Sequence, residues 1–249
     1  WIEILRTLPS PAVQVYYAEG YLWLSLRNYI NARELLPPEL ERALRRQLPA
    51  TAALLLSEEP EDYSTDHSYV KEKLETSSGW LGLVDSLELG TQMDYYTFVV
   101  ECPLFVARQW HRHRFGSFNE VSRRYVDYEP DFYLPPYLRK QAQSNKQASL
   151  EEPVQEPWNS LFLKKIGWYM QDLRELYRAM TEKGVAKELA RGVLPQFMKT
   201  RFYWTVPRIS LDNFISLRRH EGAQKEIREF ALALEELVGY RGSDKKLRL

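Results

Sequence analysis

The chain has 249 residues, of which 44% are hydrophobic and 27% are charged, a composition typical of a globular protein with one large domain or two small ones. Its 34 Lys and Arg residues balance 34 Asp and Glu residues. A formal net charge of zero argues against a general binder of nucleic acid or of membrane surfaces, which carries a basic excess. The single cysteine, Cys102, excludes an intramolecular disulfide and a thiolate metal site within one chain.

No segment has the length of a membrane span. The longest apolar stretch, residues 95–107, is interrupted by Glu101 and Pro103. Residues 1–8 contain Glu3 and Arg6 and lack a signal-peptide pattern. We therefore expect a protein of the cytoplasm that does not bind membranes.

The N-terminal part predicts strands at 12–17 and 21–26 around a turn at Glu19-Gly20. A helix is predicted from Pro37-Pro38 to about residue 48, because proline suits the first helical turn. Residues 58–68 are polar and acidic, as in a surface loop.

The middle of the chain predicts a buried strand at 95–101, which is β-branched and aromatic, and then a short helix at 104–111. Residues 139–152 are polar with few apolar side chains, which predicts a mobile loop.

The C-terminal part predicts four helices, one strand and a frayed tail. These are helices at 158–183, 186–194, 210–220 (capped by Ser210) and 223–238 (closed by Gly239), a strand at 202–206 and the tail 241–249. Helices and strands are mixed without regular βαβ alternation, and no Gly-rich phosphate loop is present. The fold class is therefore mixed, α/β or α+β.

The densest group of polar residues is the basic segment 108–125, which has five arginines and two histidines among aromatic residues. If the segment is helical, Arg108 and Arg112 share one face, and Gln109 and His113 share another. Charges this close require an anion or carboxylates nearby, and the planar fork of arginine suits phosphate. A solvated basic strip and a surface for single-stranded nucleic acid are the alternatives.

The order of residues in this segment favours a specific site. Arg112-His113-Arg114, followed after seven residues by Ser122, resembles the signature of the flavin-dependent thymidylate synthases. The preceding residues 103–110 match the same family. A second matching block runs from Glu188 to Ala231.

The resemblance implies one domain over residues 1–249, with a central mixed sheet and long helices, assembled as a homotetramer whose active sites lie between subunits. It implies reductive methylation of dUMP to dTMP, with 5,10-methylenetetrahydrofolate as carbon donor and NADPH as the source of a hydride that passes through FAD. Neither nucleic acid nor a metal takes part.

The resemblance also implies the site residues. The positions matching dUMP contacts are Gln109, Arg112, Glu120, Ser122, Arg123, Arg124 and Arg191. The positions matching flavin contacts are Arg112, His113, Arg114, Glu120 and Asn213. Arg218 matches the residue that activates the uracil, since a guanidinium beside the ring favours its anionic form.

Three differences from the family pattern are visible. Residues 87–93 lack the histidine and proline of the usual segment, Pro207 replaces asparagine, and Arg123 replaces glycine.

Cys102 lies in an apolar run, where a buried thiol is expected rather than a nucleophile. Flavin-dependent alkylation or hydroxymethylation of another pyrimidine nucleotide is the alternative reaction.

Overall fold

The computed structural model describes residues 15–18, 21–24, 38, 70–88, 90, 94–126, 128–142 and 149–240. The chain divides into two compact units, 1–67 and 68–249. The first unit contains the antiparallel pair of β1 (Val15–Ala18) and β2 (Tyr21–Leu24), as the sequence predicted. Apart from residue 38, the predicted helix at 37–48 and the predicted loop at 58–68, together with the tail 241–249, lie outside the described residues.

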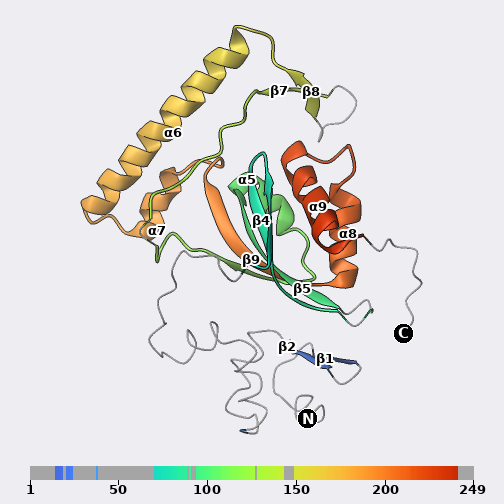
Figure 1. Cartoon of the computed structure of the whole chain (residues 1–249). Helices are drawn as coiled ribbons and strands as arrows, with labels where there is room; N and C mark the ends of the chain where they lie inside the picture. Colours follow the sequence, from blue (N-terminus) through green and yellow to red (C-terminus); the bar gives the residue numbers. More distant parts are fainter. Residues whose placement is uncertain are drawn as a thin grey trace. The chain divides into compact units, whose positions relative to one another are not determined.

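A five-stranded sheet lies at the centre of the second unit (Figure 1). In spatial order its strands are β3 (Glu72–Thr76), β4 (Gly79–Leu87), β5 (Tyr95–Pro103), β9 (Lys199–Pro207) and β6 (Ser117–Glu120). Every pairing is antiparallel, so the expected mixed sheet is wrong in this respect. The connections β3–β4 and β4–β5 are too short for the crossover that parallel neighbours need.

Strands β3 and β4 were missed by the sequence analysis, although a tight turn joins them. The amide of Gly79 donates a hydrogen bond of 3.1 Å to Oγ1 of Thr76. A Cβ atom at Gly79 would lie 1.9 Å from the backbone oxygen of Glu101, on the neighbouring strand. Only glycine allows this approach of the two backbones.

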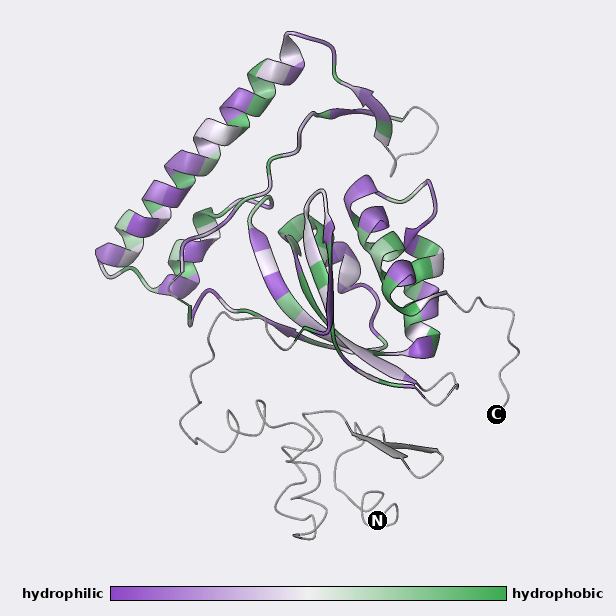
Figure 2. Cartoon of the chain, viewed as in Figure 1, coloured by the Kyte–Doolittle hydropathy of each residue, from purple (hydrophilic) through white to green (hydrophobic). Residues whose placement is uncertain are grey.

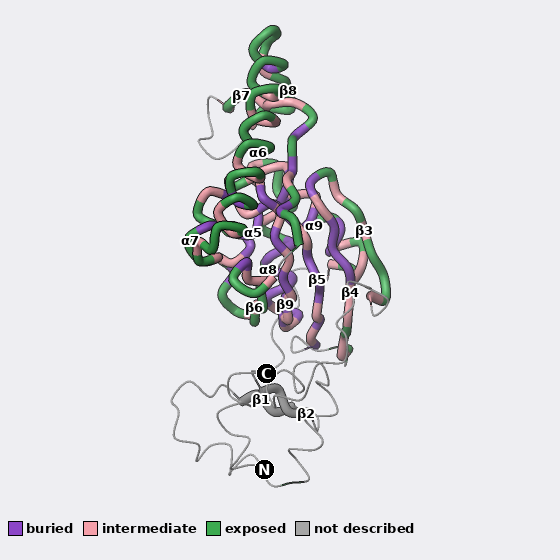
Figure 3. Tube along the Cα trace, turned by 90° about the vertical axis from the view of Figure 1, so that its left-hand side faces the viewer, coloured by how far each residue is buried: buried purple, intermediate pink, exposed green. Residues whose placement is uncertain are grey.

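The core consists of alternate residues of β5 and β9 and the helices packed on them. Phe98 pairs with Trp204 across the two strands, and both side chains are fully buried. The burial of these central strands is visible in Figure 3. The indole of Trp110 meets that of Trp204 edge to face, with ring centroids 5.4 Å apart.

Three helices contribute to this core: α5 (Leu104–Trp110), α8 (Arg208–Arg218) and α9 (Lys225–Val238). α8 begins two residues earlier than predicted, so Ser210 lies inside it and is not its cap. Arg208 is fully buried and pairs with Asp212 at 2.8 Å. Gly239 ends α9 with a φ of 65°, as predicted from its lack of a side chain.

The long helix α6 (Trp158–Glu182) extends away from the sheet and is mostly exposed (Figures 1 and 3). Polar and apolar residues alternate along it in Figure 2. The predicted helix 186–194 is divided into α7 (Lys187–Ala190) and the 3-10 turn η2 (Arg191–Val193). Tyr177 of α6 packs with Ala190, Leu194 and Met198 in a small second core.

Strands occupy both ends of the loop predicted over 139–152, so that prediction is wrong at its ends, while the mobility stays a prediction. There β7 (Arg139–Gln141) and β8 (Ser149–Pro153) form an antiparallel hairpin, because ion pairs from Arg139 and Glu151 fix it to α9. Residues 143–148 between them lie outside the described part. Among the described helices, none combines the length and the apolar character that crossing a membrane requires.

Candidate active site

Two segments far apart in the sequence meet at the C-terminal end of α5. Gln109 lies in the last turn of α5, His113 follows in the next turn, and Arg218 ends α8. The Nε of Arg218 donates a hydrogen bond of 3.0 Å to Nε2 of His113. Its Nη2 donates to the backbone oxygen of Gln109 at 3.4 Å. Three predicted site residues therefore form one group, although 105 positions separate His113 from Arg218.

Protonation in this group is set by burial. Burial first, and the positive charge of Arg218 second, lower the pKa of His113 to about 4. His113 is therefore neutral at pH 7, with its proton on Nδ1 because Nε2 accepts from Arg218. Burial also lowers the pKa of Arg218, which nevertheless stays protonated at neutral pH. Its remaining N–H groups have no partner among the described residues and are available to a ligand.

A cavity of about 500 Å³ opens on a different face of α5. Leu104, Ala107, Arg108 and His111 line it at the spacing of one helix face, which Gln109 does not share. The complete lining is Leu104, Ala107, Arg108, His111, Glu120, Val121, Ser122, Arg123, Tyr128, Glu188, Arg191, Gly192, Leu194, Gln196, Met198, Lys199 and Thr200. Four predicted dUMP residues, Glu120, Ser122, Arg123 and Arg191, are therefore brought together.

The cavity offers both cations and acceptors to a ligand. Arg108 and Arg191 are exposed and have no side-chain partner among the described residues. Lys199, by contrast, pairs with Asp131 at 2.8 Å. The carboxylate of Glu120 accepts a hydrogen bond of 2.7 Å from the hydroxyl of Thr200, which fixes its position. This arrangement suits an anion that also carries hydrogen-bond donors, as a nucleotide does.

Arg123 already has partners within the chain. The residue is buried, and its guanidinium donates to the backbone oxygens of Tyr128 and Glu129. It also lies 4.4 Å from the centre of the Tyr128 ring. Its side chain therefore stabilises one wall of the cavity, and a ligand would meet this residue mainly through its backbone.

The remaining predicted residues have no recorded hydrogen bond to the first group and do not line the cavity. The side chains of Arg112, Arg114, Arg124 and Asn213 are exposed and do not line the cavity. We predicted that Arg108 shares a helix face with Arg112, and Gln109 with His113, if the segment is helical. This prediction is wrong. α5 ends at Trp110, and a turn and strand β6 follow it.

His111 is a cavity residue that the sequence analysis left outside the site. Its ring meets Phe118 and Phe202 edge to face, with centroids 4.7 and 4.9 Å away. Its Nε2 is buried and has no hydrogen-bond partner among the described residues, and burial lowers the pKa of the imidazole. The spacing of three residues between Arg108 and His111 could have indicated that both share a face.

The single cysteine is far from reactive in this structure. Cys102 is fully buried in the core, and burial raises the pKa of its thiol well above the usual value. Within the ranges that the structure describes, no cluster of His, Cys, Asp and Glu could hold a metal ion.

Comparison with known proteins identifies relatives over most of the chain. Residues 88–240 match the family model of the thymidylate synthase complementing protein. The chain is 62% identical to a flavin-dependent thymidylate synthase of Aquifex aeolicus over 99% of its length and 80% of the relative. It is 43% identical to the enzyme of that name from Thermosipho melanesiensis, over 57% of the chain and 62% of that relative.

Solved structures resemble the fold. A UMP/dUMP methylase, PolB from Streptomyces cacaoi, bound with 5-Br UMP, aligns with a TM-score of 0.57 at 24% identity, over 67% of this chain and 88% of that one. The same methylase bound with 5-Br dUMP aligns with a TM-score of 0.52 at 28% identity, over 59% of this chain and 67% of that one. The mixed helix-and-strand architecture is therefore that of known nucleotide methylases.

Proposed function

The chain belongs to the family of flavin-dependent thymidylate synthases, and we propose on this premise that it methylates dUMP to dTMP. The one-carbon unit comes from 5,10-methylenetetrahydrofolate, and NADPH supplies the hydride. The single domain over residues 1–249 and a cytoplasmic location remain predictions. Neither a membrane nor a nucleic acid is a partner in this proposal.

The observation that carries the proposal is the meeting of Arg218 with His113 and Gln109. These residues come from the two blocks that resemble the family, and hydrogen bonds of 3.0 and 3.4 Å link them. A solvated basic strip would leave His113 in water, whereas its imidazole is buried and accepts a hydrogen bond from Arg218. The buried guanidinium of Arg123 also argues against a continuous nucleic-acid surface over 108–125.

The cavity beside α5 supplies the groups that a nucleotide phosphate requires. Arg191 and Arg108 have guanidinium donors without partners among the described residues, and Ser122 adds a hydroxyl. Arginine binds phosphate through two parallel hydrogen bonds. We assign Arg191 and Ser122 to the phosphate, with Arg124 joining them when subunits assemble.

The exposed donors after α5 suit the diphosphate of FAD. The side chains of Arg112 and Arg114 are exposed without a partner among the described residues, which fits a dianionic group. We assign these two residues, with His113, Glu120 and Asn213, to flavin binding. When bound, FAD carries the hydride from NADPH to the carbon that is transferred.

The catalytic contribution of the chain itself lies in Arg218. Its guanidinium, half-buried and oriented by the acceptor Nε2 of His113, favours the anionic form of the uracil ring beside it. Electron density then increases at C5, the atom that attacks the one-carbon unit. No proton transfer by Arg218 is required. The buried thiol of Cys102 takes no part in carbon–carbon bond formation.

Assembly into a homotetramer is supported by two features. The predicted dUMP residues fall into two groups, Gln109 on one face of α5 and the cavity residues beside another face, so a complete pocket would combine one group from each of two subunits. Trp158, Trp168 and Tyr169 of α6 are 54%, 59% and 63% exposed, a large apolar area for a single chain. We therefore place the active sites between subunits.

A second substrate is favoured by the structural relative that acts on both UMP and dUMP, which is 28% identical to this chain in its 5-Br dUMP complex. A ribonucleotide differs only by its 2′-hydroxyl group. Methylation of UMP is therefore the alternative reaction within the same chemistry.

One experiment tests the proposal. The purified protein should show the absorbance of oxidised flavin, which NADPH should bleach under anaerobic conditions. With methylenetetrahydrofolate, dUMP should yield dTMP, whereas UMP and dCMP should react at least about tenfold more slowly, as expected if one hydrogen-bonded group discriminates. A colourless protein that forms no dTMP after incubation with FAD would refute the proposal.

A further inference from the structure

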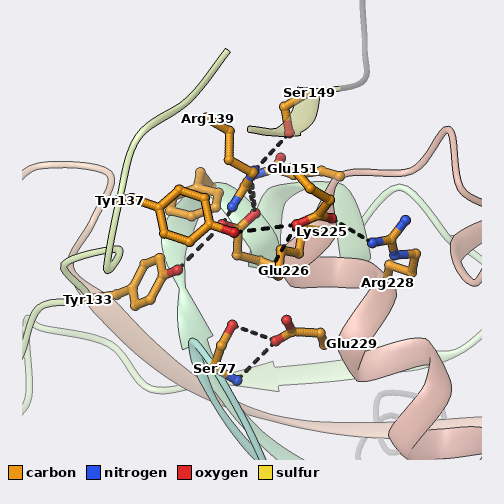
Figure 4. Close-up of polar contacts among 12 residues, drawn as sticks. Ser77, Tyr133, Tyr137, Arg139, Ser149, Glu151, Lys225, Glu226, Arg228 and Glu229 are labelled. Atoms are coloured by element: carbon orange, nitrogen blue, oxygen red, sulfur yellow. Dashed lines mark hydrogen bonds and ion pairs between the residues drawn. The ribbon is translucent and has the colours of Figure 1, made fainter. Parts of the chain in front are cut away.

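A buried carboxylate, Glu226 at the start of α9, gathers four hydrogen bonds (Figure 4). Arg139 of β7 donates from Nη2 to both of its oxygens, at 2.8 and 2.9 Å. The hydroxyl of Tyr133 donates at 3.4 Å, and the side-chain amide of Gln224 donates at 2.9 Å. Burial and the charge of Glu226 raise the pKa of Tyr133 to about 12, so its hydroxyl keeps its proton. The carboxylate is only an acceptor in this network.

The network continues from Glu226 to the candidate active site. The Oε1 of Gln224 accepts a hydrogen bond from Nε2 of Gln109. The same Nε2 also donates to the backbone oxygen of Phe105 at 3.5 Å. Gln109 in turn supplies the backbone oxygen that Arg218 contacts. One line of hydrogen bonds therefore connects the β7–β8 hairpin with the catalytic group.

The chemistry of the end members fixes the direction of every bond in this line. A guanidinium can only donate, and a carboxylate can only accept. Gln224 must therefore direct its NH₂ group to Glu226 and its oxygen to Gln109. Gln109 must then direct its NH₂ group to Gln224, and its two amide hydrogens meet Gln224 and Phe105. Only the Oε1 of Gln109 remains for a ligand, and it is an acceptor.

We propose that Glu226 and Gln224 are positioning residues, which hold the amide of Gln109 with its oxygen toward the nucleotide. Gln109 then selects an N–H or O–H donor of the bound nucleotide. This inference rests on the proposed function, in which Gln109 contacts dUMP. Without Gln224, the amide of Gln109 can rotate, and its NH₂ group then opposes the ligand donor.

A buried ion pair supports a role beyond stability. Removing two charges from water is costly, and apolar residues of similar size often stabilise a fold as well or better. Arg139 and Glu226 are 13% and 3% exposed in their side chains. We explain the pair by its effect on Gln224 rather than by stability: it fixes which end of the Gln224 amide faces Glu226.

The same hairpin offers a matched control at its exposed rim. Glu151 of β8 pairs with Lys225 at 3.1 Å and with Arg228 at 2.9 Å, both on α9 (Figure 4). Glu151→Gln and Glu226→Gln make the same chemical change between the same two elements. Only the second change touches the line to Gln109.

The test measures two quantities for dUMP: the Kd of the flavin-loaded protein, by calorimetry, and the KM. We expect Gln224→Met and Glu226→Gln to raise both the Kd and the KM about tenfold, the equivalent of one hydrogen bond. NADPH should reduce the flavin at the wild-type rate in Gln224→Met. Glu151→Gln should bind dUMP within about twofold of wild type.

A double-mutant cycle separates the inference from the proposed function. Gln109→Met should weaken dUMP binding at least about tenfold, and adding Gln224→Met should cost no more than a further twofold, because Gln224 acts through Gln109. Additive effects, or a Gln224→Met protein that loses only thermal stability, would overturn the positioning role while Gln109 keeps its place. Unchanged dUMP binding in Gln109→Met would refute its assignment in the proposed function and the inference with it.

Discussion

The Nε of Arg218 donates its hydrogen to Nε2 of His113 across 3.0 Å, joining the end of α8 to the turn after α5. The imidazole is 9% exposed and packs on Phe214, with ring centroids 4.7 Å apart. A rigid, neutral acceptor therefore fixes the plane of the guanidinium. In the proposed function, a planar uracil ring needs a guanidinium held in one orientation, since two donors must align with two ring atoms.

Replacing Arg218 tests its role as an electrostatic catalyst. We expect Arg218→Ala to slow dTMP formation in a single turnover by a hundredfold or more, about 3 kcal/mol of barrier, because the uracil anion loses its preorganised donor. Arg218→Lys should recover little of this loss, since an ammonium offers a point charge rather than a planar fork.

Two measurements distinguish this effect from a helix-end charge. A cation that only interacts favourably with the C-terminal end of the α8 dipole contributes about 0.3–1 kcal/mol to stability and nothing to turnover. Anaerobic flavin reduction by NADPH should persist in both variants, because it does not need an ionised uracil. Wild-type dTMP formation in either folded variant would contradict the assignment.

Titration of His113 gives a prediction for stability. Its pKa is about 4 in the folded protein, below the usual value of 6.5. The unfolded chain therefore binds more protons between these values, and the free energy of unfolding should fall as pH decreases from about 6.5 to about 4. Protonation would also place an imidazolium against Arg218.

The measurement is urea unfolding at pH 7 and pH 4.5 for wild type and His113→Gln. A glutamine keeps an acceptor for Arg218 but does not titrate, so the variant should lose less stability across this window. His220 is exposed and lies outside the site, so His220→Gln is the matched control and should follow wild type. Identical pH profiles for wild type and His113→Gln would show that His113 does not contribute.

Sequence reasoning was most successful where local chemistry determines the structure. The β-branched and aromatic run of β5, the short helix after it and the glycine after α9 were all recognised from neighbouring residues alone. Strand β6 was missed because its residues Ser117–Glu120 have little apolar alternation, and it forms only by pairing with β9. Long-range pairing of this kind leaves a weak local pattern.

The candidate site likewise combines features that the sequence indicates with contacts that only the fold shows. The resemblance selected His113 and Arg218, but only the fold shows that they touch. His111 and Gln224 belong to the surroundings of the site through burial and a hydrogen bond that no spacing rule contains. The end of α5 at Trp110, by contrast, lies within one residue of the helix predicted over 104–111.

Removing Arg191 tests the assignment of the cavity to a nucleotide phosphate. We expect Arg191→Gln to raise the dUMP KM between about tenfold and a hundredfold, because a charge-assisted hydrogen bond contributes about 1.5–3 kcal/mol. The effect should diminish as salt increases. Arg178 pairs with Glu129 on the exposed side of α6, so Arg178→Gln is the control and should leave the KM unchanged. A larger effect on kcat than on KM would place Arg191 at the reacting ring instead.

Cys102 provides the last prediction, because its environment opposes any role as a nucleophile. The side chain is fully buried on β5, and burial first, then the charges of Glu120 and Glu101, raise the pKa of its thiol well above the usual value. A reactive cysteine needs a thiolate and access to the substrate, and neither is available here. Cys102→Ala should therefore retain most dTMP formation and lose about 1 kcal/mol of stability through the missing sulfur contacts. The measurement is steady-state dTMP formation together with the melting temperature of the flavin-loaded variant. A folded, flavin-loaded Cys102→Ala protein that forms no dTMP would instead favour covalent catalysis by this thiol.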